Sequence, residues 1–555
     1  MHIQPEPKPK GCRTVAEWIA LFSAYTKNTL HGKFVDIYGS DTSILAKRIP
    51  VWRTALQHAA QVFGSDSDVF IVRSAGRINL MGMHIDHRGG SVNTISTGDV
   101  IFIVKPRLDN NVLLHNTSSK FPFRRFSIRD ELPNRRIHDW DQWTQDEFAE
   151  RLKAGTSADW SNYVRSAVLY LQSILTNGKG NFDPPIRGME ILVHGALPIA
   201  AGLSSSSSLF VGTADAILNV NGIELTQDEF IDLCGTGEWY VGTRGGGGDH
   251  AAIKYDACGQ IAHIGSYPLT IDLKPFPESH TIVLCNSLRT ANKSAGARDF
   301  FNELVGCYEL GMLLLRKHWP ERAPQMNRLR DLQPDLLGVD DRTVLEMIRS
   351  LPDPISREDI VAALPEERKL VEKIIGTHAE PPGGYNIRRV CLYGVAECVR
   401  SEMAAQRLEN RDIEGFGELI NISHEGDRVT CLQNGQRQPV DNYLSDKEYD
   451  HLIADLRNGD ANTAEKALLY RQPGGYNASC EELDEMVDIA RKVEGVVGAG
   501  LVGAGRGGCI IVIVEKSRAS DVIAIVEKDY YQPRGLSPSA DICQPTGGSG
   551  VLDLD

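Results

Sequence analysis

The stretch GMEILVHGALPIAAGLSSSSSLFVGTADAILNV, residues 188–220, constrains the fold of this chain most strongly. Its β-branched run predicts a strand, the next residues a loop of small side chains, and the last a helix. This order brings the first N–H groups of a helix beside a loop, an arrangement that binds phosphate. A serine-rich N-cap before an ordinary helix explains the same residues equally well, and the spacing G-x-x-x-x-G-K-[ST] of a Walker loop is missing.

Three other glycine-rich segments punctuate the chain: GRINLMGMHIDHRGG (76–90), GEWYVGTRGGGGDH (237–250) and VGAGRGGC (502–509). Glycine permits close backbone approaches, so polar loops of this kind often build binding sites, although a surface turn accounts for each one alone. Four consecutive glycines before Asp249 are costly in folding entropy. A loop that presents this carboxylate to a ligand explains them better than a flexible surface loop does.

The length of 555 residues predicts two domains with added segments rather than one core. The mixed pattern of strands and helices indicates the α+β class. We expect an N-terminal helical extension over 1–66, a first domain over 67–299 and a second, helix-rich domain over 300–555, with a more polar insertion at about 429–476.

Composition narrows the function classes. The chain carries 59 Lys+Arg against 73 Asp+Glu, a net charge of -14, which argues against nucleic acid as a partner. Neither a signal peptide nor a membrane span is found in the sequence, so we expect a cytoplasmic protein without a membrane partner. The 11 cysteines form no C-x-x-C pair and fit reduced, mostly buried thiols.

In colinear order, GRINLMGMHIDHRGG, LPIAAGLSSSSSLF, GEWYVGTRGGGGDH and VVGAGLVGAGRGGC resemble the signature motifs of galactokinases in the GHMP kinase superfamily. The resemblance runs from about residue 70 to about 515. It implies a two-domain GHMP kinase fold with the active site in the interdomain cleft. It also implies an ATP- and Mg²⁺-dependent sugar 1-kinase that phosphorylates the anomeric hydroxyl of galactose or a galactose-configured sugar.

By this resemblance, Asp249 is the catalytic aspartate and Arg77 the arginine that faces it across the first carbon of the sugar. A carboxylate can accept the hydroxyl proton while a guanidinium keeps it ionised. Ser206 and Glu238 match the magnesium-binding pair, and a hard cation favours such oxygen ligands.

The remaining implied contacts concern the phosphates and the sugar. The phosphate loop comprises Gly202, Leu203, Ser204, Ser205 and Ser206, and Gly505 and Gly507 shape the site from the second domain. Asp86 occupies the position that grips the ring hydroxyls, and His84 the position near the sixth carbon. Sugar and ATP are the expected partners of a monomer or weak homo-oligomer.

Three departures from the family pattern leave the sugar open. Met83 replaces the glutamate that bonds the sixth hydroxyl, and Phe300 a tyrosine that faces the sugar. The string HIDHRGG is similar to galacturonate kinases, with Arg88 as an anion partner; L-arabinose and N-acetylgalactosamine are further alternatives. Ala200 and Ala201 replace phosphate-loop glycines, which keeps open a catalytically weak sugar and ATP sensor.

Overall fold

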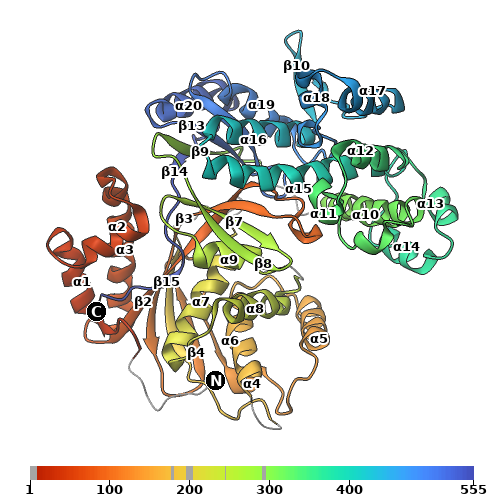
Figure 1. Cartoon of the computed structure of the whole chain (residues 1–555). Coiled ribbons are helices and arrows are strands. Elements are labelled where there is room, and N and C mark those ends of the chain that lie inside the picture. Colours follow the sequence, from red (N-terminus) through yellow and green to blue (C-terminus); the bar gives the residue numbers. More distant parts are fainter. Residues whose placement is uncertain (1–8, 177–179, 196–203, 244–245, 290–294, 555) are drawn as a thin grey trace.

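The computed structural model describes residues 9–176, 180–195, 204–243, 246–289 and 295–554. A nine-stranded and a four-stranded sheet organise these residues, one in each lobe, and a third sheet is a two-stranded hairpin. A group of helices extends beside the four-stranded sheet (Figure 1). Strands and helices are mixed in both lobes, so the α+β prediction is confirmed.

The larger sheet has nine strands. Its main path runs β1-β2-β3-β6-β4-β5, while β7 pairs with β3 and β8, and β15 pairs with β2. Only the β4–β6 pair of this sheet is parallel within the described chain. The strands are β1 (Arg13–Thr14), β2 (Asp68–Met81), β3 (Val92–Pro106), β4 (Asn111–Asn116), β5 (Arg124–Ser127), β6 (Met189–Gly195), β7 (Gln260–Ser266), β8 (Leu269–Pro275) and β15 (Gly550–Val551).

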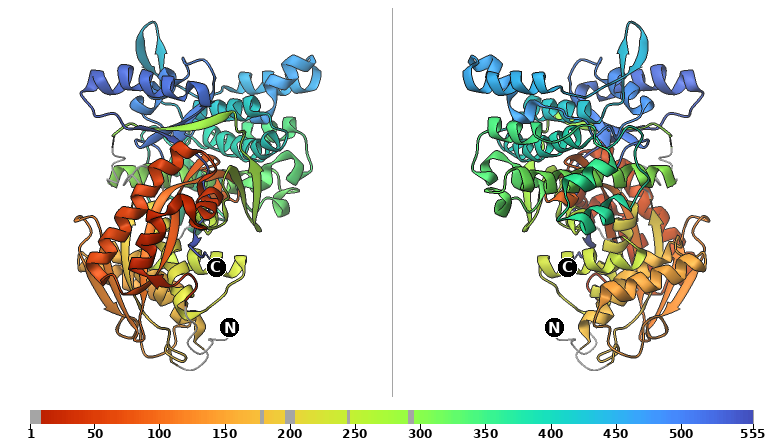
Figure 2. Two further views of the ribbon diagram at one scale, coloured as in Figure 1. Left: turned by 90° about the vertical axis from the view of Figure 1, so that its left-hand side faces the viewer. Right: turned by 90° about the vertical axis from the view of Figure 1, so that its right-hand side faces the viewer.

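Helices cover both faces of this sheet, and the alternation of side chains along β2 explains why. Phe70 and Val72 join the core with α6 and α7, whereas Val69 and Ile71 point to the opposite face and pack under α1–α3. Figures 1 and 2 show these N-terminal helices on the outer side of the sheet. The helices of this lobe are α1 (Val15–Ser23), α2 (Leu30–Tyr38), α3 (Thr42–Phe63), α4 (Ile128–Glu131), α5 (Trp140–Lys153), α6 (Ser161–Leu175), α7 (Ser205–Asn221), α8 (Gln227–Gly237) and α9 (Gly248–Tyr255).

The smaller sheet is antiparallel in the order β12-β13-β9-β14. Successive residues of β9 point to opposite faces of the sheet: Ile282 packs against α16, and Val283 against α19 and α20. The elements are β9 (His280–Asn286), β12 (Val496–Val502), β13 (Cys509–Glu515), β14 (Ala540–Cys543), α16 (Ile413–Asp427), α19 (Glu481–Ala490) and α20 (Ala519–Val526).

The chain crosses between the sheets at both ends of this lobe. Strand β9 precedes residue 300 yet belongs to the smaller sheet, and after β14 the chain returns to the larger one. There Thr546 N donates to Ser96 O and Gly547 N to Ile37 O, before β15 pairs with β2. Because each sheet takes strands from both sides of residue 300, the sheets do not define the domain limits 67–299 and 300–555, which remain a prediction.

The helical region beside the smaller sheet has its own apolar core. It contains α10 (Ala295–His318), α11 (Pro334–Leu337), α12 (Asp341–Arg349), α13 (Arg357–Ala363), α14 (Arg368–Ile375) and α15 (Ile387–Glu409). The segment predicted as an insertion holds the hairpin β10 (Thr430–Gln433) and β11 (Gln436–Pro439), then α17 (Asp446–Asn458), which packs on α12, and α18 (Ala461–Ala467).

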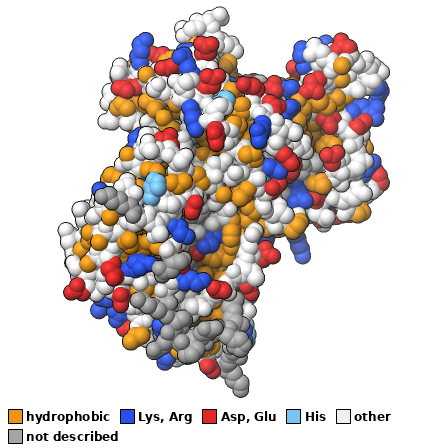
Figure 3. Space-filling view, turned by 60° about the vertical axis from the view of Figure 1, so that its left-hand side comes forward, with side chains coloured by type: hydrophobic (Ala, Val, Ile, Leu, Met, Phe, Trp, Pro, Cys, Tyr) orange, Lys and Arg blue, Asp and Glu red, His pale blue; other side chains and the backbone are white. Residues whose placement is uncertain are grey.

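Surface and thiol chemistry agree with the composition. On the face drawn in Figure 3, Lys and Arg side chains are interspersed with Asp and Glu rather than gathered in one basic patch. No helix in the described ranges has both the length and the apolar character needed to cross a membrane. All 11 cysteines are free thiols, and most are buried, as the sequence predicts.

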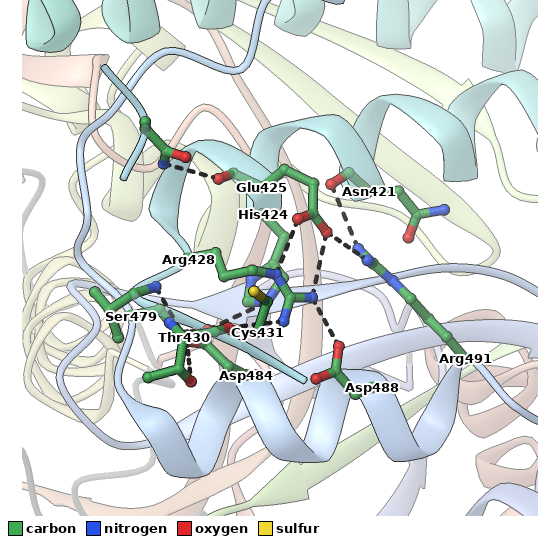
Figure 4. A network of polar contacts seen from close by, with 12 residues as sticks. Asn421, His424, Glu425, Arg428, Thr430, Cys431, Ser479, Asp484, Asp488 and Arg491 are labelled. Carbon is green, nitrogen blue, oxygen red and sulfur yellow. Dashed lines mark hydrogen bonds and ion pairs between the residues drawn. The ribbon is translucent and has the colours of Figure 1, made fainter. Parts of the chain in front are cut away.

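A polar network joins α16, the hairpin and α19 (Figure 4). Asp484 Oδ2 accepts hydrogen bonds from Val429 N at 3.0 Å and Thr430 N at 2.8 Å. Beside it, His424 is fully buried, with Nε2 at 3.5 Å from Asp484 Oδ1. Burial lowers the pKa of His424 well below its ordinary value, and the nearby Arg428 and Arg491 act in the same direction.

This burial predicts acid lability. Folded His424 stays neutral, whereas the unfolded chain protonates it below about pH 6.5, so the free energy of unfolding should fall as the pH drops through that value. We expect urea unfolding of His424→Gln between pH 8 and pH 5.5 to show a slope smaller by up to about 1.4 kcal/mol per pH unit. Equal slopes for both proteins would contradict a neutral buried histidine.

Candidate active site

Arg77 and Asp249, the two predicted catalytic residues, form a bidentate ion pair. Arg77 Nε lies 2.7 Å from Asp249 Oδ1, and Nη2 lies 2.8 Å from Oδ2. Arg77 comes from β2 and Asp249 from the first turn of α9. The arginine side chain is 12% exposed and the carboxylate 31%, so the pair is largely shielded while the carboxylate stays open to a small molecule.

Two opposed effects set the charge of Asp249. Burial raises its pKa, but the Arg77 guanidinium and the hydrogen bonds it donates outweigh that effect, so the pKa lies below the ordinary value. Ser204 Oγ also donates to Asp249 Oδ2 at 3.0 Å. Asp249 is therefore a carboxylate at neutral pH, held by two donors that come from two other elements.

The backbone of β2 explains how a strand residue reaches this site. Its pairing with β3 shifts register between Ser74 and Gly76 and again between Asn79 and Met81. Such irregularities bend a strand and re-aim its side chains, and Arg77 lies between the two. Gly82 follows with φ +87°, and a Cβ there would lie 2.3 Å from Ser91 O, so only glycine fits this turn.

The predicted phosphate loop leads into α7. Ser204 has φ 48° and makes no side-chain cap to the helix, since its hydroxyl bonds Asp249 instead. The first N–H groups of this 17-residue helix are thus left without that cap, as an anion site needs. Gly202 and Leu203 lie outside the described residues, as do Ala200 and Ala201.

Ser206 and Glu238, the predicted metal pair, both lie near Tyr163. Tyr163 reports on both: burial and the Glu238 charge raise its pKa, and a hydrogen bond with the Ser206 side chain lowers it. Glu238 Oε2 lies 3.3 Å from His250 Nε2. In the described part of the chain, no group of three or more His, Cys, Asp or Glu residues could hold a metal ion. This donor set fits Mg²⁺ that takes most of its ligands from phosphate and water.

The segment 82–91 between β2 and β3, here called the sugar loop, carries three of the predicted sugar contacts, and their side chains have different surroundings. His84 is buried and stacks on Tyr476, with ring centroids 4.3 Å apart, and its Nε2 lies 3.4 Å from Asp427 Oδ1. Asp86 instead keeps 47% of its side chain exposed. Met83 packs against the apolar cluster of the smaller sheet. Of these residues, Asp86 is therefore the one with a carboxylate open to a ligand.

The helical region contacts the sugar loop and the adjoining start of β3 at three points. Gly82 N donates to Glu397 Oε1 at 3.1 Å, and Asn93 Nδ2 donates to Ser401 Oγ at 2.9 Å, both on α15. Arg88, which the sequence offers as an anion partner, pairs with Glu309 of α10 at 2.9 Å. These contacts come from residues more than 200 positions away, so sequence spacing gave no sign of them.

The late glycine loop meets Phe300. The Arg506 guanidinium lies 3.5 Å from the Phe300 ring centroid, a cation–π contact that leaves the ring half-buried. Gly505 has φ +89°, and a Cβ there would lie 2.0 Å from Ala478 O; Gly507 has φ 137°. Both glycines are required by the backbone, while their part in nucleotide binding and that of Phe300 in sugar binding stay predictions.

Asp427 is a residue that the sequence did not single out. Its Oδ2 accepts a hydrogen bond from Tyr393 Oη at 3.1 Å, while Oδ1 faces His84. Asp427→Ala should lower the free energy of unfolding by about 1–3 kcal/mol, because the buried Tyr393 hydroxyl loses its acceptor and the buried His84 ring loses the carboxylate that faces it. Urea unfolding measures this. Tyr393→Phe, which removes only one bond, is the control with a smaller loss, and an unchanged midpoint for Asp427→Ala would remove Asp427 from the support of the loop.

Comparisons with known proteins show which family models and which relatives this chain matches. The galactokinase galactose-binding signature matches residues 60–104, the GHMP kinases N terminal domain matches 162–257 and the GHMP kinases C terminal model matches 452–532. The galactokinase of Dictyostelium discoideum is 24% identical over 491 residues, covering 85% of this chain and 86% of that protein. The chain carries the N- and C-terminal GHMP kinase domains and the galactose-binding signature of galactokinases, and it is similar to galactokinases along most of its length. It is accordingly a galactokinase-like phosphotransferase.

Other relatives agree in length and fold. The galactokinase of Streptococcus thermophilus is 25% identical over 497 residues and covers 89% of this chain and 97% of that protein. The structure of Lactococcus lactis galactokinase complexed with galactose superposes with a TM-score of 0.59 at 22% identity, over 90% of this chain and 99% of that one. This confirms the GHMP kinase fold; the interdomain position of the active site remains a prediction.

Proposed function

We propose that the protein is an ATP-dependent sugar 1-kinase that transfers the γ-phosphoryl group to the anomeric hydroxyl of galactose or a galactose-configured sugar. The ion pair of Arg77 and Asp249 beside the start of α7 carries this proposal. Sequence likeness to galactokinases and the matched galactose-binding signature support it.

In this reaction Asp249 receives the proton of the anomeric hydroxyl or holds its developing charge. Arg77 keeps the carboxylate ionised despite its burial, and Ser204 fixes the second oxygen. Phosphoryl transfer needs little covalent chemistry from the protein, so positioning and charge supply most of the rate. The exposed carboxylate of Asp86 would orient the ring hydroxyls while buried His84 supports the loop from behind.

The start of α7 would hold the phosphates of ATP, and Ser206 with Glu238 would hold Mg²⁺. Mg²⁺ held there would neutralise part of the charge on the phosphates. The uncapped N–H groups of α7 orient the phosphates toward Asp249. Gly505 and Gly507 would shape the nucleotide side of the site.

The sugar itself depends on the corner near Met83. A thioether offers no strong partner to a sixth hydroxyl, which suits L-arabinose, and Arg88 is already paired with Glu309, so galacturonate must compete for it. We test the choice by ADP release with D-galactose, D-galacturonate, L-arabinose and N-acetylgalactosamine, with Mg²⁺ and ATP. Turnover on one of them supports the kinase. Sugar and ATP binding without turnover on any would instead support the sensor.

Met83→Glu tests the specificity corner directly. Restoring a carboxylate should raise kcat/KM for D-galactose relative to L-arabinose by about 10-fold or more, because a hydrogen bond to a charged group is worth about 1.5–3 kcal/mol. Met83→Gln, which offers a neutral acceptor of similar size, is the matched control with a smaller gain. An unchanged ratio for both variants would place Met83 outside the sugar site.

The wider setting is proposed in the same way. The protein would act in the cytoplasm as a monomer or weak homo-oligomer, without nucleic-acid or membrane partners. Net charge -14 and the mixed surface charges support the expected absence of a nucleic-acid partner. The kinase domains would span 67–299 and 300–555, with 1–66 and about 429–476 as additions.

A further inference from the structure

A pocket of about 570 Å³ lies between α10, α14 and the segment 326–329, and the sugar loop closes one side of it. This volume is within the range of small-molecule sites. Its apolar wall includes Val305, Met312 and Ile374. His87 and Arg88 line it, directly after Asp86, whereas Arg77 and Asp249 do not. The pocket therefore adjoins the proposed sugar site without containing the catalytic pair.

The charges on its wall favour an anion. Four cationic side chains line the pocket, Arg88, Arg316, Arg328 and Lys373, against the single carboxylate of Glu309. This excess is notable in a chain of net charge -14. Like charges concentrated in a recess raise the local concentration of an oppositely charged ligand.

Most of this positive charge is not neutralised. Arg316 donates to the carbonyl oxygens of Met326 at 2.6 Å and Asn327 at 3.1 Å, contacts that leave its charge in place. The Arg328 guanidinium stacks over the Tyr267 ring at 4.0 Å. Lys373 is exposed. Within the described ranges, only Arg88 of the four forms an ion pair, with Glu309.

Two polar atoms of residues that line the pocket are buried without a hydrogen-bond partner. Tyr308 is fully buried, yet its hydroxyl has no hydrogen-bond partner among the described residues. Arg88 Nε is likewise buried without a partner in the described structure. Buried polar groups are nearly always satisfied, so these two atoms leave hydrogen-bonding capacity unused in the wall of the pocket.

We propose that this pocket binds a small molecule with a phosphate or carboxylate group on an apolar or ring-shaped body, and that its occupancy changes sugar affinity. His87 provides the link, because its backbone N donates to Asp86 Oδ1 at 2.7 Å and its ring Nδ1 lies 3.1 Å from the same oxygen. A ligand that moves His87 must also move Asp86. The coupling rests on the proposed function, whereas the binding does not.

Fluorescence titration of the full chain with 8-anilinonaphthalene-1-sulfonate tests the binding. Lys373→Glu should weaken it about fivefold or more, because the substitution reverses a charge at the pocket. Lys447→Glu, at an exposed lysine of α17, should leave it unchanged. N-phenyl-1-naphthylamine, the same body without the sulfonate, should bind both variants equally. Equal affinity of the sulfonate for all three proteins would overturn the proposal.

A second variant tests whether the dyes bind in this pocket, and two competing anions test which chemical class the pocket recognises. Val305→Trp should reduce binding of both dyes, because it fills the pocket without changing its charge. Pyrophosphate or citrate at millimolar concentration should displace the sulfonate dye, and whichever competes better identifies the phosphate or the carboxylate class. Displacement by neither would show that the pocket does not recognise anions.

Calorimetry of sugar binding tests the coupling. The dissociation constant of the preferred sugar should change about threefold or more when the sulfonate dye saturates the wild type, and not in Lys373→Glu. Binding of the dye with no effect on the sugar would refute the coupling. Failure of every sugar to bind would instead refute the proposed function, and the dye titration would still decide the pocket.

Discussion

Asp249→Asn is expected to lower kcat by about 10³-fold, with much smaller changes in KM for ATP and for the sugar. The amide keeps the size of the side chain but cannot accept a proton, and it loses the charge that Arg77 and Ser204 hold in place. ADP release measured with the preferred sugar gives both constants. Because the interaction is lost in the transition state rather than on substrate binding, kcat should carry nearly all of the effect.

Two controls separate chemistry from folding in this variant. Asp228→Asn makes the same substitution at an exposed position in the first turn of α8 and should keep wild-type activity. Thermal unfolding shows how much stability Asp249→Asn loses, since a buried arginine is left without its charged partner. A well-folded Asp249→Asn protein that retains more than a tenth of the wild-type kcat would remove Asp249 from the chemistry.

Arg77→Met should remove several kcal/mol of transition-state stabilisation, measured as a lower kcat/KM. The pH dependence of kcat/KM should change as well. Burial raises the pKa of Asp249, and in the wild type the Arg77 charge outweighs burial. Without that charge burial dominates, so the pKa rises. As the pH falls, the variant should therefore lose activity at a higher pH than the wild type does.

The same linkage fixes the sign for stability. In the wild type the folded pKa of Asp249 is depressed, so its contribution to stability is present above the unfolded pKa and is lost as the pH falls through the folded value.

For the pH dependence of activity, Arg77→Lys is the matched control, because it keeps the charge but not the bidentate geometry. Its acid limb should stay near that of the wild type. Identical pH profiles for wild type and Arg77→Met would refute the proposed role of the guanidinium.

Sequence predicted those parts of the molecule that local pattern determines. The β-branched run in GMEILVHG predicted the strand that is β6, and the glycine and serine loop before a helix predicted the start of α7. Motif resemblance also placed Arg77 and Asp249 together, although 172 positions separate them, and the structure brings their side chains into contact. Pattern and resemblance together therefore sufficed for the family and for the central ion pair.

Other contacts between distant segments could not be predicted in this way. The place of His84 near the sugar stays a prediction, and its contacts with Tyr476 and Asp427, in segments far along the chain, could not be foreseen from spacing. The left-handed backbone of Ser204, which turns its hydroxyl to Asp249, has no signal in a run of identical serines. Such features arise from tertiary packing, which local propensity does not encode.

The most direct test of the proposed 1-kinase is the position of the phosphate in the product. ³¹P and ¹³C NMR of a reaction with Mg²⁺, ATP and each of the four sugars should show, for at least one, a phosphate on the anomeric carbon that is missing in Asp249→Asn. Phosphate on a different carbon, or no phosphosugar from any of the four with ATP and sugar both bound, would contradict the proposed function.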